Sequence, residues 1–115
     1  MRAGAGALSP AAVLVSCGWD AHARDPLAPL LVSTEGYTQA ARLVLDAAGA
    51  LCDGRVVVAL EGGYDEHALA WCASTLCELL LGEAPTPDPE PVTAPASEPQ
   101  IDDVLRALGL EAGLA

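Results

Sequence analysis

Two short apolar runs, separated by a helix-like segment, restrict the folds open to this chain. They are Ala12 to Cys17, with the sequence AVLVSC, and Arg55 to Leu60, with the sequence RVVVAL. Continuous runs rich in Val and Leu are typical of strands that are buried on both faces of a parallel sheet. Two strands alone would both be sheet edges, with apolar faces left uncovered. We therefore expect this chain to form part of a larger α/β domain.

Each apolar run is followed by a segment with apolar residues at helical spacing. The first helix is expected to start at the N-cap Ser33, with Glu35 in its first turn, and to end at Asp53-Gly54. The second is expected over 66–81, with Gly82 at its end. The apolar stripe of the first helix comprises Tyr37, Ala41, Val44, Ala48 and Leu51. Strands that alternate with helices predict an α/β fold of β-α-β-α order, with parallel strands and right-handed crossovers.

Composition divides the chain into four stretches. Residues 1–9 are rich in Ala and Gly, and residues 10–83 contain the predicted strands and helices. Residues 84–99 hold six prolines and predict a linker or an extended surface segment. Residues 100–115 contain IDDVLRALGL, which predicts a short amphipathic helix. We expect the acidic residues between Asp88 and Asp103 to form a solvated surface.

Charge and hydropathy exclude several classes of protein. The chain has 52% hydrophobic residues and a mean hydropathy of +0.36, which is too apolar for disorder of the whole chain. It has 16 acidic residues and 5 basic ones, a net charge of −11, which argues against direct binding of nucleic acid. No apolar run reaches the ~18 residues that a membrane span needs. We expect a cytoplasmic protein without a membrane or nucleic-acid partner.

The four cysteines are Cys17, Cys52, Cys72 and Cys77. We expect them to be free, buried, small apolar side chains rather than two disulfides of a secreted protein. Cys72 and Cys77 are five residues apart on a predicted helix, so they face different directions and make a poor zinc pair. The segment Leu14 to Cys17 also has the look of a lipoprotein cleavage box, but the preceding Pro10 and the strand pattern favour a strand.

Chemically active residues follow both predicted strands. Ligands of parallel α/β sheets bind outside the carboxyl ends of the strands. Asp20 and His22 follow the first strand and are both metal-ligand types, but such a pair needs a further ligand. Asp20 could equally cap its loop, and a surface or supporting histidine is the favoured interpretation of His22. After the second strand, Glu61 could accept loop amides, Gly62-Gly63 could be a turn or a close approach to a ligand, and Tyr64 could simply pack.

Together these segments resemble a known family. The stretch VLVSCGWDAHARDPLAPL, followed by STEGY and then by GRVVVALEGGYD, is similar to the zinc-dependent histone deacetylases. The nearest likeness is to the class II branch and to bacterial acetylpolyamine amidohydrolase-like members. The resemblance covers residues 10–83. It implies the C-terminal β-α-β-α part of a parallel-sheet arginase/deacetylase-like fold.

The resemblance also implies roles for five residues. Asp20, in its G-W-D-A context, matches a zinc-binding aspartate, and Tyr64, in E-G-G-Y, matches the tyrosine that donates a hydrogen bond to the substrate carbonyl. Gly62 and Gly63 match glycines that border the acetyl-lysine channel, and Leu27, in D-P-L, matches an apolar residue of the channel wall. The implied cofactor is zinc, and the implied substrate is an acetylated amine, either acetyl-lysine or an acetylated polyamine.

The chain departs from the family pattern at the remaining catalytic positions. Two further zinc ligands, in an Asp-x-His sequence, and the histidine pair that acts as general base have no counterpart in this sequence. His22 does not match a family ligand, and His67 lacks the paired context. We expect the isolated chain to be inactive, weakly stable and prone to self-association through uncovered apolar surface. The alternative is a non-catalytic remnant that docks on an intact homologue.

Overall fold

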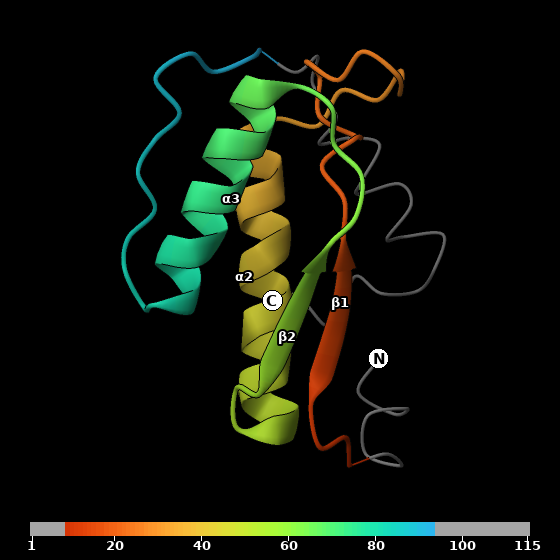
Figure 1. Cartoon of the computed structure of the whole chain (residues 1–115). Coiled ribbons are helices and arrows are strands. Elements are labelled where there is room, and N and C mark those ends of the chain that lie inside the picture. The colour runs from red at the N-terminus through yellow and green to blue at the C-terminus, as the bar shows by residue number, and fades with distance from the viewer. Residues whose placement is uncertain (1–8, 94–115) are drawn as a thin grey trace, which may run out of the picture.

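The computed structural model describes residues 9–93 and shows an α/β arrangement of two strands and two helices (Figure 1). The elements are, in chain order, β1 (Val13–Cys17), α2 (Thr34–Cys52), β2 (Val56–Leu60) and α3 (Glu66–Leu80). β1 and β2 pair in parallel, in register from Val13 opposite Val56 to Cys17 opposite Leu60. The predicted fold class and element order are therefore confirmed. The helix predicted within 100–115 lies outside the described residues.

Side-chain caps explain where both helices begin, and a left-handed residue explains where α2 ends. The Ser33 hydroxyl oxygen accepts a hydrogen bond from the Gly36 amide at 3.1 Å, and the Asp65 carboxylate accepts one from the Ala68 amide at 2.8 Å. Each cap satisfies an amide that has no partner within its helix. α2 ends at Asp53, which adopts the left-handed conformation with φ 55°. The sequence predicted the Ser33 cap and the Asp53-Gly54 end correctly.

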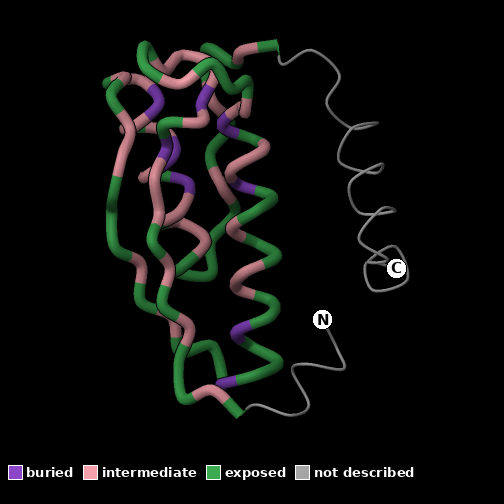
Figure 2. The backbone as a smooth tube through the Cα atoms, turned by 90° about the vertical axis from the view of Figure 1, so that its right-hand side faces the viewer, coloured by how far each residue is buried: buried purple, intermediate pink, exposed green. Residues whose placement is uncertain are grey.

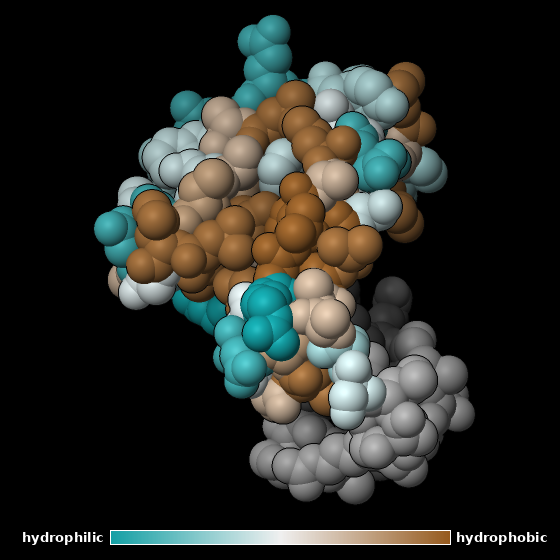
Figure 3. Space-filling view, turned by 60° about the horizontal axis from the view of Figure 1, so that its bottom comes forward, coloured by the Kyte–Doolittle hydropathy of each residue, from teal (hydrophilic) through white to brown (hydrophobic). Residues whose placement is uncertain are grey.

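Both helices cover the same face of the sheet (Figure 1). Val15 of β1 and Val58 of β2 line an apolar cavity of about 120 Å³ together with residues of α2 and α3. On the opposite face, Leu14 is 78% exposed and Val57 is 59% exposed, and these two residues are paired in register. Figure 3 shows apolar side chains gathered in one broad area of the molecular surface. Within residues 9–93, the strands are thus covered on one face only.

The best-buried part of the described chain lies at the carboxyl ends of the strands and around the helix N-termini (Figure 2). Trp19, in the loop after β1, is 6% exposed. Buried polar side chains of this region include His22, Thr34, Thr38 and Thr75. This end of the molecule is therefore held by hydrogen bonds as well as by apolar contacts.

All four cysteines are free, as expected, but not all are buried. Cys52 and Cys72 are buried, Cys17 is half-buried and Cys77 is exposed, so the prediction of buried thiols was wrong for Cys77 and only partly met for Cys17. The buried residues of α3 are Ala68, Cys72 and Thr75, and Cys77, two positions after Thr75, lies on the other side of the helix. Burial raises the pKa of the Cys72 thiol to about 12. No helix within residues 9–93 is long and apolar enough to cross a membrane.

Candidate active site

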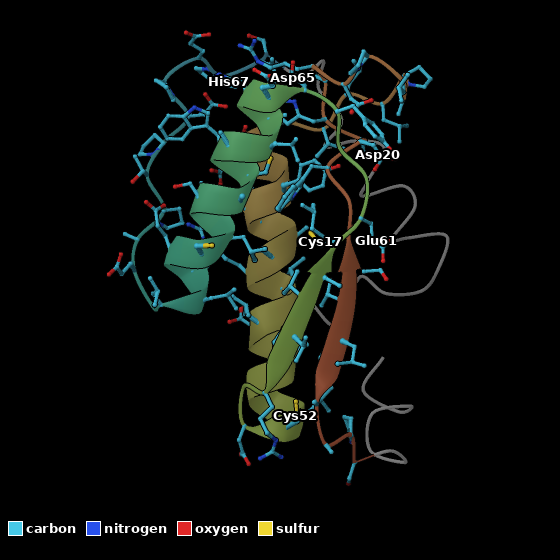
Figure 4. All side chains as sticks on the ribbon, in the orientation of Figure 1. Cys17, Asp20, Cys52, Glu61, Asp65 and His67 are labelled. Carbon is cyan, nitrogen blue, oxygen red and sulfur yellow. The ribbon has the colours of Figure 1, made fainter. Side chains whose placement is uncertain are left out.

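The loops that follow β1 and β2 meet at the carboxyl edge of the sheet. The Trp19 amide donates a hydrogen bond to the Gly62 carbonyl at 2.8 Å, and the Glu61 amide donates one to the Cys17 carbonyl at 2.8 Å. Figure 4 shows Asp20 and Glu61 beside this edge, while Cys52 lies at the far end of α2. The parallel topology therefore brings the two sequence motifs together, as predicted.

Asp20 lies against the backbone of both loops. A Cβ atom added at Gly18 would lie 2.9 Å from Asp20 Oδ1, and one added at Gly62 would lie 3.2 Å from Asp20 Cγ. Any larger residue at either position would displace the carboxylate. Asp20 itself is exposed to solvent. Glycines at 18 and 62 thus leave room for an accessible carboxylate between the two loops.

Gly63 is required for a different reason. Its φ of +130° belongs to backbone that residues with a side chain rarely adopt. A Cβ atom at this position would lie 3.3 Å from Trp19 Cβ and 3.2 Å from Leu69 Cδ2. The second glycine therefore brings the β2 loop onto the buried Trp19 and sets the direction in which the chain leaves toward Tyr64.

Tyr64 and Leu27 both present exposed side chains at this edge. Tyr64 is 59% exposed and Leu27 is 71% exposed. The Asp25 carboxylate binds the backbone at both residues, accepting from the Tyr64 amide at 3.0 Å and from the Leu27 amide at 2.8 Å. Asp25 was not among the site residues predicted from the sequence. Its position before a proline is a signal for the turn at Leu27, but nothing local in the sequence predicts the contact with Tyr64, 39 residues away.

His22 is a buried structural histidine and not a surface one. It is fully buried, and its ring stacks on Tyr37 with a centroid separation of 6.4 Å. Burial lowers the pKa of the imidazole, against the opposite influence of Asp65 and Asp88. Nδ1 accepts from the Arg24 amide at 3.1 Å, so the proton of the neutral ring is on Nε2, which lies 3.1 Å from Thr34 Oγ1.

A hydrogen-bond network behind the site includes a residue that was expected to be solvated. The side chain of Asp88 is only 5% exposed. Its carboxylate accepts from the Thr34 hydroxyl at 2.6 Å, from His67 Nε2 at 2.9 Å and from the Glu90 amide at 2.9 Å. Burial alone would raise the pKa of Asp88, but these hydrogen bonds lower it. The expectation of a solvated acidic surface was therefore wrong for Asp88, because spacing in a proline-rich segment does not show which side chain reaches the helix N-termini.

Two further side chains support the loops. The Tyr37 hydroxyl accepts a hydrogen bond from the Ala21 amide at 3.0 Å, and burial raises its pKa to about 12. Glu61 was expected to accept from loop amides, but it accepts from the Ser16 hydroxyl at 3.1 Å. These contacts fix the segments on either side of Asp20.

The described residues supply only part of a metal site. Among residues 9–93, no group of three or more His, Cys, Asp or Glu side chains could hold a metal ion. Asp20 is accessible and lies beside glycine backbone that leaves space for a ligand. Carboxylate oxygen is a normal zinc ligand, and zinc requires about four ligands in all. Asp20 therefore fits zinc as one member of a larger ligand set.

The fold and the site define a class of protein, an α/β protein with a ligand site at the carboxyl edge of parallel strands. The site consists of an accessible carboxylate, an exposed phenol and a glycine turn. The sequence profile of the histone deacetylase domain matches residues 3–80. The chain belongs to the histone deacetylase domain family.

Individual relatives agree with this assignment. Histone deacetylase 15 of Arabidopsis thaliana is 35% identical over 107 residues, which is 93% of this chain and 18% of that protein. A histone deacetylase-like amidohydrolase of Pseudomonas aeruginosa is 37% identical over 73 residues, 64% of this chain and 19% of that protein. The crystal structure of the HDA15 HD domain superposes with a TM-score of 0.60 at 35% identity, covering 89% of this chain and 27% of that one. The chain thus spans less than one fifth of these curated relatives and about a quarter of the solved domain.

Proposed function

We propose that this chain supplies one wall and two reacting groups of a zinc-dependent deacetylase site that hydrolyses N-acetyl amides. The observation that carries the proposal is the close approach of the accessible Asp20 carboxylate to Gly62, where an added Cβ would lie 3.2 Å from Asp20 Cγ; Gly62 is two residues before the exposed Tyr64. One group suited to a metal and one suited to an oxyanion are thereby held on adjoining loops. Family membership supplies the class of reaction.

Asp20 would be the metal ligand of this chain. When zinc is bound in such a site, it polarises the amide carbonyl and lowers the pKa of a bound water. The carboxylate would contribute negative charge from a backbone that is held in place, because Trp19 beside it is buried and its amide is bonded to the Gly62 carbonyl. A side chain at Gly62 would crowd this carboxylate, and one at Gly18 would crowd both the carboxylate and the Gly62 backbone nitrogen.

Tyr64 would donate a hydrogen bond from its hydroxyl to the substrate carbonyl oxygen. Such a donor stabilises the negative charge that develops on that oxygen as the amide carbon becomes tetrahedral. The exposed side chain of Leu27 would contribute an apolar channel wall, and Gly62 and Gly63 would border the channel, because neither has a side chain that narrows it. The substrate class is an acetylated amine, with acetyl-lysine and acetylated polyamines both compatible with an apolar wall.

A chimeric domain tests this proposal. Residues 9–83 would replace the matching segment of the HDA15 HD domain, and zinc content, circular dichroism and hydrolysis of an acetyl-lysine reporter would be measured. We expect the chimera to hydrolyse the reporter, and Asp20→Ala to lower its zinc content. A chimera with the parent's zinc content and dichroism but no hydrolysis would overturn the proposal.

We further propose that the 115-residue chain is inactive when isolated. A single carboxylate does not hold zinc tightly, because affinity depends on the full ligand set. Dialysis against zinc followed by metal analysis is expected to leave less than stoichiometric metal, and the acetyl-lysine reporter is expected to remain intact. Stoichiometric zinc together with turnover would contradict this expectation.

The second candidate function is a non-catalytic interaction module, and the exposed Leu14–Val57 pair favours it. Apolar residues on a bare sheet face stabilise association when a second surface covers them. Sedimentation equilibrium would report self-association of the chain, and Val57→Lys is expected to shift it toward monomer. If the chain stays monomeric at all concentrations, an interaction module that acts by self-association is excluded.

A further inference from the structure

Asp25 binds the two loops of the candidate site with both oxygens of one carboxylate. Oδ1 accepts from the Leu27 amide at 2.8 Å and from the Ala28 amide at 3.1 Å, while Oδ2 accepts from the Tyr64 amide at 3.0 Å. The hydrogen bonds within 25–28 form a local turn. The bond to Tyr64 crosses from the loop after β1 to the loop after β2.

Tyr64 depends on this contact more than its neighbours do. It follows Gly63, which has no side chain to restrict its backbone, and it precedes Asp65, which is fixed as the cap of α3. The side chain of Tyr64 is 59% exposed, so packing restrains it little. The Gly62 carbonyl is held by the Trp19 amide, and the Tyr64 amide is held by Asp25. The loop after β1 thus holds the β2 loop at two points.

We propose that Asp25 is a positioning residue that sets the separation between Leu27 and Tyr64. This inference rests on the proposed function, in which Leu27 and Tyr64 both belong to the substrate channel. Asp25 does not touch substrate in this scheme. Its carboxylate accepts hydrogen bonds from the backbone amides of both residues, so a shift of the carboxylate moves Leu27 and Tyr64 together.

The test is nuclear magnetic resonance on the full 115-residue chain, with amide exchange as the readout. In the unsubstituted chain the Tyr64 amide is expected to exchange more slowly than its intrinsic rate. In Asp25→Ala, we expect exchange at Tyr64 to rise on the order of tenfold or more, because a hydrogen bond to a charged acceptor is lost. Exchange at Tyr37, whose amide is bonded to the Ser33 carbonyl, is expected to stay the same.

The matched control is Asp46→Ala, which removes an exposed carboxylate from α2 and should change neither tyrosine. A rise at Leu27 and Ala28 with no change at Tyr64 would overturn the proposal, since Asp25 would then only build its own turn. An equal rise at Tyr37 would overturn it as well, because the effect would be a general loss of stability. Exchange of the Tyr64 amide at its intrinsic rate in the unsubstituted chain would also overturn the proposal. No turnover is measured, so failure here leaves the proposed function standing, and failure of deacetylation leaves this result intact.

Discussion

Truncation of Asp88 is expected to lower the stability of the described fold. The carboxylate accepts three hydrogen bonds, from Thr34, His67 and the Glu90 amide, and its side chain is 5% exposed. In Asp88→Ala, the buried Thr34 hydroxyl loses its acceptor, although His22 Nε2 can still donate to it. A hydrogen bond that involves a charged group contributes about 1.5–3 kcal/mol.

The three bonds do not add, because two of the donors can return to water. His67 is 22% exposed at its side chain, and the Glu90 amide belongs to an exposed residue. Removing Asp88 also removes the cost of its burial. We therefore expect a loss of about 2 kcal/mol in the free energy of unfolding, equivalent to roughly one bond of this kind. For a domain of this size, that corresponds to a fall in Tm of about 8–16 °C.

Urea unfolding followed by tryptophan fluorescence measures this loss, with Trp19 and Trp71 as probes. Trp71 lies 6.2 Å from His67 between ring centroids, so it also reports on this network. The control is Glu83→Ala, because Glu83 is exposed and its side chain makes no hydrogen bond or ion pair among residues 9–93. If Asp88→Ala and Glu83→Ala unfold at the same urea concentration, the hydrogen bonds of Asp88 do not stabilise the fold and the reasoning is refuted.

Three further outcomes follow from the same geometry. Folding lowers the pKa of Asp88, so its contribution to stability is complete above the ordinary value of 3.8. This contribution is lost as the pH falls through the lower pKa of the folded state. Acid titrations should therefore show a steeper loss of unfolding free energy in the native chain than in Asp88→Ala. Gly63→Ala is expected to destabilise the fold by about 1–3 kcal/mol through its positive φ and its contact with Trp19, measured as a urea midpoint, and an unchanged midpoint would contradict this. In the chimeric domain, Asp25→Ala is expected to lower kcat when Tyr64 is present, but to lower it little further in a Tyr64→Phe background. If the effects of the two substitutions on kcat are fully additive, Asp25 acts by another route.

Local signals in the sequence predicted most of the secondary structure. Ser33 and Asp53 marked the limits of α2, because a side-chain cap and a left-handed end depend on residues only a few positions away. The parallel pairing of β1 and β2 followed from the helix between them. The meeting of the Asp20 and Gly62 loops then followed from the topology.

Contacts between distant segments were not predictable in this way. Asp88 reaches Thr34 across 54 residues, and Asp25 reaches Tyr64 across 39. Both carboxylates occur in proline-containing segments, where composition indicates extended chain and says nothing about tertiary partners. The burial of His22 escaped prediction for a related reason, since its partner Thr34 is fixed by the start of α2 and not by the loop that contains His22.

If Asp20 and Tyr64 belong to one deacetylase site, as proposed, turnover depends on the Tyr64 hydroxyl, and Tyr64→Phe removes it. In the chimeric domain, kcat for the acetyl-lysine reporter is expected to fall by about 10²–10³ with zinc content unchanged, because one donor to the developing oxyanion is removed. Asp46→Ala is the control, since Asp46 is exposed on α2 and lies outside the loops of the candidate site. A Tyr64→Phe chimera that keeps the unsubstituted rate would contradict the claim.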